Sequence, residues 1–389
     1  MYSSSVCIKI HLERLRYNLR ILRSRYPNVM PVIKANAYGH GIRVVANVLR
    51  DEGVQHMAVG SITEGFLLRQ EGHQAFLLAL LGPFSEEDAR IAVLHNITPV
   101  IHNIESLQSI VNCSRLHQGG VAVPVAIKID TGMSRLGFSS NDYVSLIDLL
   151  RHTPEVNPIL LVSHLVAPEV SSLDNVTHNQ VEQFARAYEA IKEVFPNIKT
   201  SLTNSPGLLA WPNYIGDFSR PGIALYGGNP FYGTSRASLG KGFLPVMEVE
   251  APVVAINTIF AGSSIGYGCT YYAKEDIRVA VIGAGYADGY SRSFSNKGWV
   301  VIKGKRYRIV GRVCMQMLMV DITSSHTKIS IGDKAFLLGG GGSLAIKPEE
   351  LAEWWGTIPH EVCCSLGSSI GVQQKQLVII GDNYYSDTF

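Results

Sequence analysis

The sequence predicts an α/β protein in which an N-terminal (β/α)8 (TIM) barrel precedes a C-terminal mainly-β domain. From residue 29 to about 225, short apolar or β-branched runs alternate with amphipathic segments. Beyond residue 235, strand-like runs follow one another almost without helices. A chain of 389 residues is long enough for one large and one smaller domain. We therefore place the barrel in residues 1–235 and the β domain in residues 236–389.

Eight runs are the expected barrel strands, and the fourth and eighth give the weakest signals because they are short. They are residues 29–34, 57–60, 76–81, 98–101, 122–129, 158–163, 199–203 and 217–220. Between the sixth and seventh runs, apolar side chains recur every three or four residues, which predicts a helix. These side chains are Val181, Phe184, Tyr188 and Ile191. Eight such units in about 200 residues are typical of a (β/α)8 barrel.

The β domain is predicted from β-branched and aromatic runs. These runs are residues 246–259, 279–282, 299–302, 306–310, 318–322 and 335–338. Residues 303–305 are expected to form a hairpin turn, and one late helix begins at Pro348. The extended segment at residues 6–10 precedes every barrel strand, and we expect it to pair with the β domain.

Composition narrows the classes of ligand. The chain is 46% hydrophobic and 17% charged with a formal net charge of +2, so it has neither a basic stripe for nucleic acid nor an acidic tail. Its six cysteines show no CxxC or Cys/His ligand spacing, which predicts no metal site and no disulfide framework. The N-terminus lacks an apolar signal region, and the longest apolar run, residues 76–81, is too short to cross a bilayer. We expect a cytoplasmic protein that binds a small molecule.

Barrel enzymes carry their chemistry at the carboxyl ends of the strands. Polar groups follow five of the predicted strands at that end, and they are Lys34, Lys128, Asp130, His164, Asn204, Ser205 and Arg220. The loops after the seventh and eighth strands are the usual phosphate-binding place in this fold. There the chain offers the Ser205 hydroxyl and the backbone amides of Gly222 and Ile223.

Lys34 lies in the segment VIKANAYGHG at residues 32–41. An amine in a low-dielectric site has a lowered pKa and readily forms an imine with a carbonyl compound. Tyr38, four residues later, offers a hydroxyl to an anion at the same place. Taken alone, Lys34 is better explained as a lysine with a buried stem and a solvated amine.

Eight strings in one order decide between these interpretations. They are VIKANAYGHG (32–41), KIDTGMSRLGF (128–138), SH (163–164), TNSPG (203–207), SRPGIALYG (219–227), IGYGCTYYA (265–273), GYADGYSR (285–292) and GRVCM (311–315). With them, the chain resembles the alanine racemase family of pyridoxal-phosphate enzymes over nearly its whole length. The resemblance implies interconversion of L- and D-alanine, which supplies D-alanine for peptidoglycan.

The resemblance also implies roles for individual residues. Lys34 would hold pyridoxal 5′-phosphate as an aldimine, and Lys34 and Tyr267 would be the two bases of proton transfer. The residues implied to bind the cofactor are Lys34, Tyr38, His164, Ser205, Arg220, Gly222 and Ile223. Arg220 would face the pyridine nitrogen, and an ion pair with Asp217 is its alternative.

The substrate carboxylate is implied to lie against Arg135 and the backbone of Met315. Lys128 matches a lysine that some members carbamylate, and an ordinary pair with Asp130 is the alternative. Residues implied to line the entry channel between two subunits are Tyr286, Arg292 and Arg312. The resemblance therefore implies a homodimer in which Tyr267 and Met315 serve the partner's lysine.

Three departures from the family pattern concern substrate breadth more than reaction type. Gln316 replaces a usual aspartate, Gly367-Ser368-Ser369-Ile370 replaces the usual C-terminal motif, and the loop at residues 165–169 differs. A serine or broader-specificity racemase is therefore the second hypothesis. A basic amino-acid decarboxylase and a non-catalytic cofactor-binding protein are further alternatives. The Arg135 and Tyr267 motifs count against the first, and the β domain with its Tyr267 and Cys314-Met315 motifs counts against the second.

Overall fold

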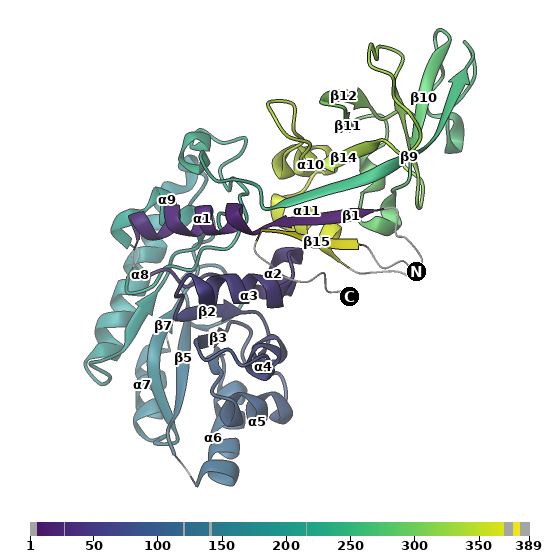
Figure 1. The fold of residues 1–389 in the computed structure, drawn as a ribbon. Coiled ribbons are helices and arrows are strands. Elements are labelled where there is room, and N and C mark those ends of the chain that lie inside the picture. Colours follow the sequence, from purple (N-terminus) through teal and green to yellow (C-terminus); the bar gives the residue numbers. More distant parts are fainter. Residues whose placement is uncertain are drawn as a thin grey trace.

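The computed structural model describes residues 6–26, 28–119, 121–139, 142–214, 216–368 and 376–381. In these residues a seven-stranded parallel sheet and an eight-stranded, mostly antiparallel sheet form the two parts of the molecule. Figure 1 shows the parallel sheet with its helices at one end and the β domain at the other. The predicted fold class, a barrel followed by a mainly-β domain, is confirmed.

The parallel sheet has the order β2-β3-β4-β5-β7-β8, with the short β6 paired to β5. Its strands are β2 (His56–Val59), β3 (Phe76–Ala79), β4 (Thr98–Ile101), β5 (Val123–Asp130), β6 (Phe138–Ser139), β7 (Val156–Val162) and β8 (Lys199–Ser201). Six of the eight predicted barrel strands are therefore present, with ends shifted by a few residues.

The first and eighth predicted strands, residues 29–34 and 217–220, are wrong as strands. They contribute only isolated parallel bridges, which join Ser201 to Phe218, Val29 to Ser219, and Val32 to Ala58. Pro31 and Pro221 lie in or beside these segments, and proline has no N–H with which to extend a ladder. The three bridges nevertheless close the sheet into a ring of eight positions.

Helices cover the outside of the ring (Figure 1). They are α1 (Leu12–Arg25), α3 (Ile42–Asp51), α4 (Ile62–Gln70), α5 (Glu86–Leu94), α6 (Ile104–Gln118), α7 (Tyr143–Arg151) and α8 (Asp174–Lys192). The short α2 (Lys34–Gly39) and α9 (Ser205–Ala210) lie instead at the carboxyl ends of the strands. The predicted helix around Phe184 is α8, where Phe184 and Ile191 are buried. Short 3₁₀ turns are η1 (Ser171–Leu173), η2 (Pro212–Tyr214), η3 (Ala237–Gly240), η4 (Tyr267–Cys269), η5 (Tyr286–Asp288) and η6 (Arg292–Phe294).

The β domain contains the predicted strands, among them β1 from the extended segment at residues 6–10, and one strand that was not predicted, β15. The strands are β1 (Cys7–His11), β9 (Met247–Ile259), β10 (Ile277–Ile282), β11 (Trp299–Ile302), β12 (Lys305–Arg308), β13 (Leu318–Asp321), β14 (Lys334–Leu338) and β15 (Gln376–Ile380). β1 pairs antiparallel with β9 and parallel with β15, so the start of the chain lies in the last domain (Figure 1). Lys303 and Gly304 form the hairpin turn between β11 and β12 with positive φ angles of 49° and 76°.

In the described residues two helices, not one, lie between β14 and β15. α10 (Pro348–Trp355) begins at Pro348 as predicted. α11 (Pro359–Gly367) was not predicted, although Pro359 and Glu361 in its first turn are ordinary signals of a helix start. This second helix packs against α2 and so joins the β domain to the segment that carries Lys34.

One large hydrophobic cluster of buried residues joins the barrel to the β domain. It includes Leu19 of α1, Val59 of β2, Val249 of β9 and Leu351 of α10. Because side chains from both parts pack in the same cluster, the two parts hold each other in a fixed arrangement. The residues of the barrel and of α11 that face each other at the carboxyl ends of the strands are therefore held in fixed positions, and the cavity between them has a defined shape.

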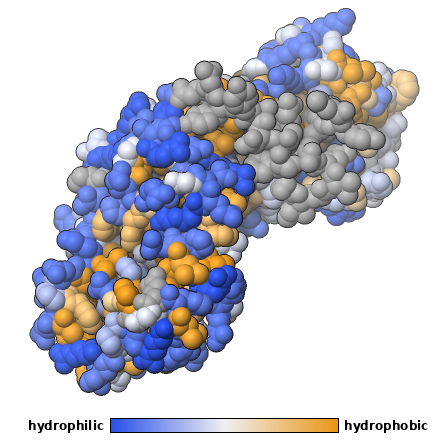
Figure 2. All heavy atoms as spheres, turned by 60° about the horizontal axis from the view of Figure 1, so that its bottom comes forward, coloured by the Kyte–Doolittle hydropathy of each residue, from blue (hydrophilic) through white to orange (hydrophobic). Residues whose placement is uncertain are grey.

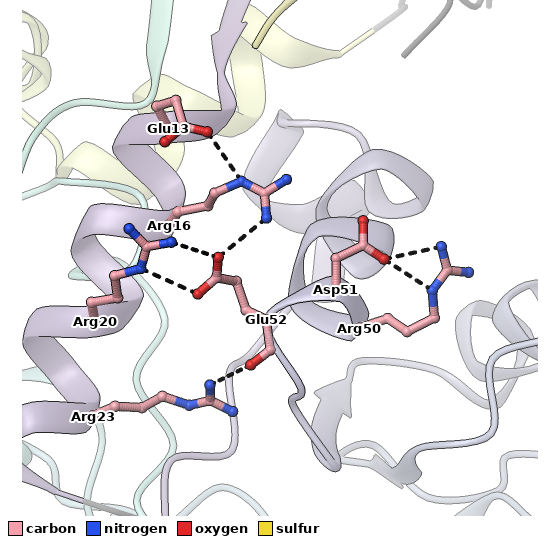
Figure 3. Close-up of polar contacts among 7 residues, drawn as sticks. All are labelled: Glu13, Arg16, Arg20, Arg23, Arg50, Asp51 and Glu52. Atoms are coloured by element: carbon pink, nitrogen blue, oxygen red, sulfur yellow. Dashed lines mark hydrogen bonds and ion pairs between the residues drawn. The ribbon is translucent and has the colours of Figure 1, made fainter. Parts of the chain in front are cut away.

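Outside this cluster, charges tie α1 to the end of α3 (Figure 3). The Glu52 carboxylate accepts from Arg16 at 3.3 Å and from Arg20 at 2.9 Å, and Arg23 donates to the Glu52 carbonyl oxygen at 2.5 Å. Arg16 also lies 3.2 Å from Glu13. These contacts fix the first helix against the barrel.

The surface of the barrel end mixes small hydrophobic patches with hydrophilic residues (Figure 2). Exposed apolar side chains there include Ile104 and Leu116 of α6 and Val144 of α7. None of the helices in the described residues combines the length and the apolar character needed to span a bilayer.

Candidate active site

Lys34 follows the first barrel segment, as predicted, but the turn that it opens is left-handed. The four residues after it, Ala35 to Tyr38, have φ between 52° and 55° and ψ between 37° and 54°. For residues other than glycine this conformation costs about 1–2 kcal/mol each, so surrounding contacts must hold it. Asn36 Oδ1 accepts from the Ile42 amide at 2.8 Å and leads the turn into α3. The sequence did not predict the hand of this turn.

A cavity of about 1290 Å³ opens at the carboxyl ends of the barrel strands. Eight of the ten predicted site residues line it, and they are Lys34, Tyr38, Arg135, His164, Ser205, Arg220, Gly222 and Ile223. Lys128 lines it as well. The fold thus gathers in one cavity side chains from distant parts of the chain.

Tyr38, Ser205 and Gly222 form a cradle of neutral donors on one wall. The Ser205 hydroxyl oxygen accepts from the amides of Gly222 at 2.9 Å and Ala224 at 3.3 Å, which leaves its own proton for another acceptor. The Ile223 amide has no hydrogen-bond partner in the described part of the chain. A Cβ on Gly222 would lie 2.2 Å from the Tyr38 hydroxyl oxygen, so only glycine fits there. Such a set of donors suits a phosphate.

Arg220 is buried in the floor of the cavity and is 3% exposed. Its guanidinium donates to the Ser163 carbonyl oxygen at 2.5 Å and to the Ser201 hydroxyl. Burial lowers the pKa of Arg220 to about 10, so the group stays charged at neutral pH. The alternative ion pair with Asp217 is wrong, because the Asp217 carboxylate instead accepts from the Thr200 amide and hydroxyl at 2.8 and 2.9 Å.

His164 is neutral in these surroundings. Burial, and after it the charges of Arg220 and Lys128, hold the pKa of His164 well below its usual value. Asn204 Nδ2 donates to His164 Nε2 at 3.3 Å, which makes Nε2 the acceptor of the ring. A neutral imidazole on the cavity wall can pack against an aromatic ligand.

Two lysines in the cavity have lowered pKa values. Lys34 is accessible from the cavity, but the walls displace bulk water, and this desolvation, followed by the charge of Arg135, lowers the pKa of its amine. Burial, with Arg220 and Arg135, lowers the pKa of Lys128 to about 8. Between Lys128 and Asp130, both described, there is no ion pair, because Asp130 Oδ1 instead accepts from three backbone amides. These belong to Gly132, Met133 and Ser134.

Tyr267 and Met315 are the two predicted site residues that do not line this cavity. They lie on the β domain and are 70% and 57% exposed. Arg312 packs against the turn of Tyr267, since a Cβ on Gly268 would lie 2.7 Å from Arg312 Nη1. Tyr286 and Arg292 are exposed on the same domain. A single chain therefore does not bring these groups to Lys34.

The sequence analysis missed four residues that shape the cavity. Glu64, His360 and Cys364 line it, and the Tyr226 ring stacks on Tyr38 with centroids 4.9 Å apart. α11 brings His360 and Cys364 to the cavity by packing on α2, where a Cβ on Gly367 would lie 2.0 Å from the Gly39 carbonyl oxygen. Helix propensity gives no information on such a long-range contact.

Of the residues suspected of altering substrate breadth, Leu165, Val166 and Glu169 of the loop at residues 165–169 line the cavity, whereas Gln316 and Ser368 do not. Gln316 is exposed beside Met315. Ser368 donates to the Ser365 carbonyl oxygen at 2.7 Å, while Ser369 and Ile370 lie outside the described residues. Within the described residues, His, Cys, Asp and Glu side chains form no group of three or more that could hold a metal ion.

Fold and cavity together define the class: a barrel enzyme with a C-terminal β domain, whose site offers a primary amine, a buried guanidinium and neutral anion donors. Two family models match the chain, "Alanine racemase, N-terminal domain" over residues 10–230 and "Alanine racemase, C-terminal domain" over residues 246–373. The chain is 95% identical over 380 residues, 98% of this chain and 100% of the relative, to the alanine racemase of Lawsonia intracellularis (strain PHE/MN1-00).

Solved structures of alanine racemases are also similar to this chain. The alanine racemase from D-cycloserine-producing Streptomyces lavendulae matches with a TM-score of 0.88 at 28% identity, covering 98% of each chain. The alanine racemase from Bartonella henselae with covalently bound pyridoxal phosphate matches with a TM-score of 0.85 at 28% identity, covering 97% of this chain and 100% of that one. The chain belongs to the alanine racemase family and interconverts L- and D-alanine. Enzymes of this family generally depend on pyridoxal phosphate.

Proposed function

We propose that this racemase works at the barrel cavity, with pyridoxal 5′-phosphate held covalently by Lys34 and with Lys34 and Tyr267 as its acid/base pair. The observation that carries the proposal is that one cavity gathers the Lys34 amine, the buried Arg220 guanidinium and the donors around Ser205. A lysine with a lowered pKa is a better nucleophile toward a carbonyl group than an ordinary lysine.

The cavity residues fit this cofactor. The hydroxyls of Tyr38 and Ser205 and the amides of Gly222 and Ile223 would hold its phosphate, and His164 would pack against its ring. When bound, the cofactor supplies an electron-withdrawing ring that acidifies the Cα–H bond of an attached amino acid.

Arg220 limits that electron withdrawal. Because its pKa of about 10 keeps the guanidinium protonated, Arg220 could only donate a hydrogen bond to the ring nitrogen of a bound cofactor and would leave that nitrogen without a proton. A ring that withdraws electrons less strongly favours return of the proton to the substrate over its transfer to the cofactor. Arg220 thereby directs the reaction toward racemisation.

Inversion at Cα needs an acid/base group on each face of the substrate, because a proton removed from one side must return from the other. Lys34 serves one face. For the other face we assign Tyr267 of a second copy of the chain, since Tyr267 is 70% exposed and does not line the cavity of its own chain. The enzyme is therefore a homodimer with shared sites, in which Arg135 and the partner-side backbone at Met315 hold the substrate carboxylate.

The two parts of the chain divide these tasks. The barrel, residues 1–235, binds the cofactor, and residues 236–389 contribute Tyr267 and Met315 to the other subunit. In the cell we place the reaction in the cytoplasm, where its product D-alanine is used to build peptidoglycan.

Lys34→Ala tests this proposal. Purified chain should absorb at the wavelength of the bound cofactor and racemise alanine in a chiral assay, and Lys34→Ala should lose both, with activity falling at least about 10³-fold. Lys199→Ala is the matched control, because Lys199 is an exposed barrel lysine 3.5 Å from Asp217, and it should keep both properties. Full activity in Lys34→Ala would refute the assignment.

A further inference from the structure

We propose that Glu64 is a positioning residue for Lys34, and that its carboxylate fastens the left-handed turn carrying the lysine to the end of the neighbouring barrel strand. This inference rests on the proposed role of Lys34 as the residue that holds the cofactor. Glu64 lies on α4 and lines the cavity. The sequence analysis assigned it no role.

The geometry of the carboxylate is that of a bridge. Glu64 Oε2 accepts from the amides of Gly60, just after β2, at 2.7 Å and of Ser61 at 3.3 Å. Glu64 Oε1 accepts from the Asn36 amide, two residues after Lys34, at 3.3 Å. Lys34 is also packed closely here, since a Cβ on Gly60 would lie 3.2 Å from Lys34 Cβ. One side chain thus joins two strand ends of the barrel.

The turn needs such an external partner. Its residues Ala35 to Tyr38 all have positive φ although none is glycine, so the turn depends on contacts with its surroundings. Hydrogen bonds between amides and a carboxylate are stronger than those between neutral groups. Glu64 is itself held in place, because Ser61 caps the first turn of α4 by accepting from the Glu64 amide at 3.1 Å.

Glu64 also carries a negative charge toward an electropositive cavity. Besides Glu64, the groups whose charges act on the Lys34 amine are Arg135, Cys364 and Arg220, and Lys128, His164 and His360 line the same cavity. Desolvation and Arg135 lower the pKa of Lys34, whereas Cys364 and Glu64 raise it. Removing the charge of Glu64 should therefore lower the pKa of the Lys34 amine further.

Three variants separate positioning from helix capping. Glu64→Gln keeps the length of the side chain, but its NH₂ group would face an amide donor and its charge is lost. Glu64→Asp keeps the charge but is too short to reach Asn36. Ser61→Ala removes the cap of the same helix, at a cost of about 1 kcal/mol, and leaves the bridge to Asn36.

The readouts are the affinity for added pyridoxal 5′-phosphate and the pKa of Lys34. The affinity is measured by fluorescence titration, and the pKa by NMR of ¹³C-methylated lysines in the cofactor-free full chain, with Lys34→Ala assigning the signal. We expect Glu64→Gln to raise the Kd about tenfold, which is about 1.4 kcal/mol, and to lower the pKa of Lys34. Glu64→Asp should raise the Kd with a smaller change in pKa, and Ser61→Ala should change neither.

If Glu64→Gln does not fold, the comparison of Glu64→Asp with Ser61→Ala decides, because Glu64→Asp keeps the charge and the cap position. Equal Kd and pKa values in the Glu64 and Ser61 variants would overturn the inference, since Glu64 would then be only a capping residue. A cofactor bound elsewhere than at Lys34, found by borohydride reduction and peptide mapping, would instead refute the proposed function. The Lys34 pKa in cofactor-free protein would still test Glu64.

Discussion

Gly222 and Tyr38 approach each other so closely in the anion cradle that an added methyl group must displace the tyrosine. Gly222→Ala would place a Cβ 2.2 Å from the Tyr38 hydroxyl oxygen. Overpacking of this kind costs about 1–3 kcal/mol, and we expect the Kd for pyridoxal 5′-phosphate to rise at least about tenfold. Gly53→Ala is the control, since an added Cβ there meets nothing within 4 Å, and the strain of alanine at its φ of +71° should leave the Kd unchanged. An unchanged Kd in Gly222→Ala would show that the cradle does not hold the cofactor phosphate.

Lys128 makes folding stability depend on pH in a defined direction. Burial lowers its pKa to about 8 from the ordinary 10.5, so its protonated form is less favourable in the folded than in the unfolded chain. The resulting destabilisation of the folded chain has its full size below about pH 8 and decreases as the pH rises toward 10.5.

Lys128→Met removes that titration. In urea unfolding with bicarbonate-free buffer, we expect Lys128→Met to be more stable than the unmodified chain at pH 7, with a smaller advantage at pH 10. Lys199→Met, at an exposed lysine, serves as the control. The same difference in unfolding free energy at both pH values would contradict a buried, desolvated Lys128.

For individual residues, the sequence analysis predicted correctly which polar side chains lie at the strand ends, because the apolar pattern of each strand indicates which residue follows it. Lys34, His164 and Arg220 were found in this way, and all three line the cavity. Glu64 and the left-handed turn were missed for a physical reason. Residues 35–38 contain no glycine, and their backbone conformation depends on contacts with segments far away in the sequence.

At the scale of elements, α11 is the contact between the β domain and the Lys34 turn. A Cβ on Gly367 would lie 2.0 Å from the Gly39 carbonyl oxygen, so Gly367→Ala should push α11 away from α2. We expect thermal unfolding several degrees lower and weaker binding of pyridoxal 5′-phosphate. Gly356→Ala, at the C-cap of α10 where an added Cβ meets nothing within 4 Å, should lower the unfolding temperature without changing the Kd. Identical effects of the two variants would refute a role of α11 in holding the turn.

Barrel strands show where pattern reading succeeds and fails. β5 and β7 were predicted nearly in full, because long apolar runs in a buried parallel sheet leave little ambiguity. Residues 29–34 and 217–220 were expected as strands and form single bridges, since Pro31 and Pro221 interrupt the ladder. Their predicted positions as the first and eighth members of the barrel were nevertheless correct, because isolated bridges join each segment to its neighbours on both sides.

In the proposed homodimer, one chain presents two separate halves of a site. Its cavity holds Lys34, while Tyr267 is 70% exposed on the other domain. A shared hydrophobic cluster fixes barrel and β domain relative to each other, and Tyr267 stays outside the cavity that Lys34 lines in its own chain. Strand and helix patterns carry no information on how two copies meet, so this arrangement was expected only from the resemblance to the alanine racemase family.

The most direct test mixes two inactive variants, Lys34→Ala and Tyr267→Phe, and allows their subunits to exchange. Each mixed dimer would contain one site with both substitutions and one site with Lys34 from one chain and Tyr267 from the other. Random exchange should therefore restore about a quarter of the unmodified activity in a chiral alanine assay. If native mass spectrometry shows mixed dimers and no activity returns, the two-chain site is contradicted.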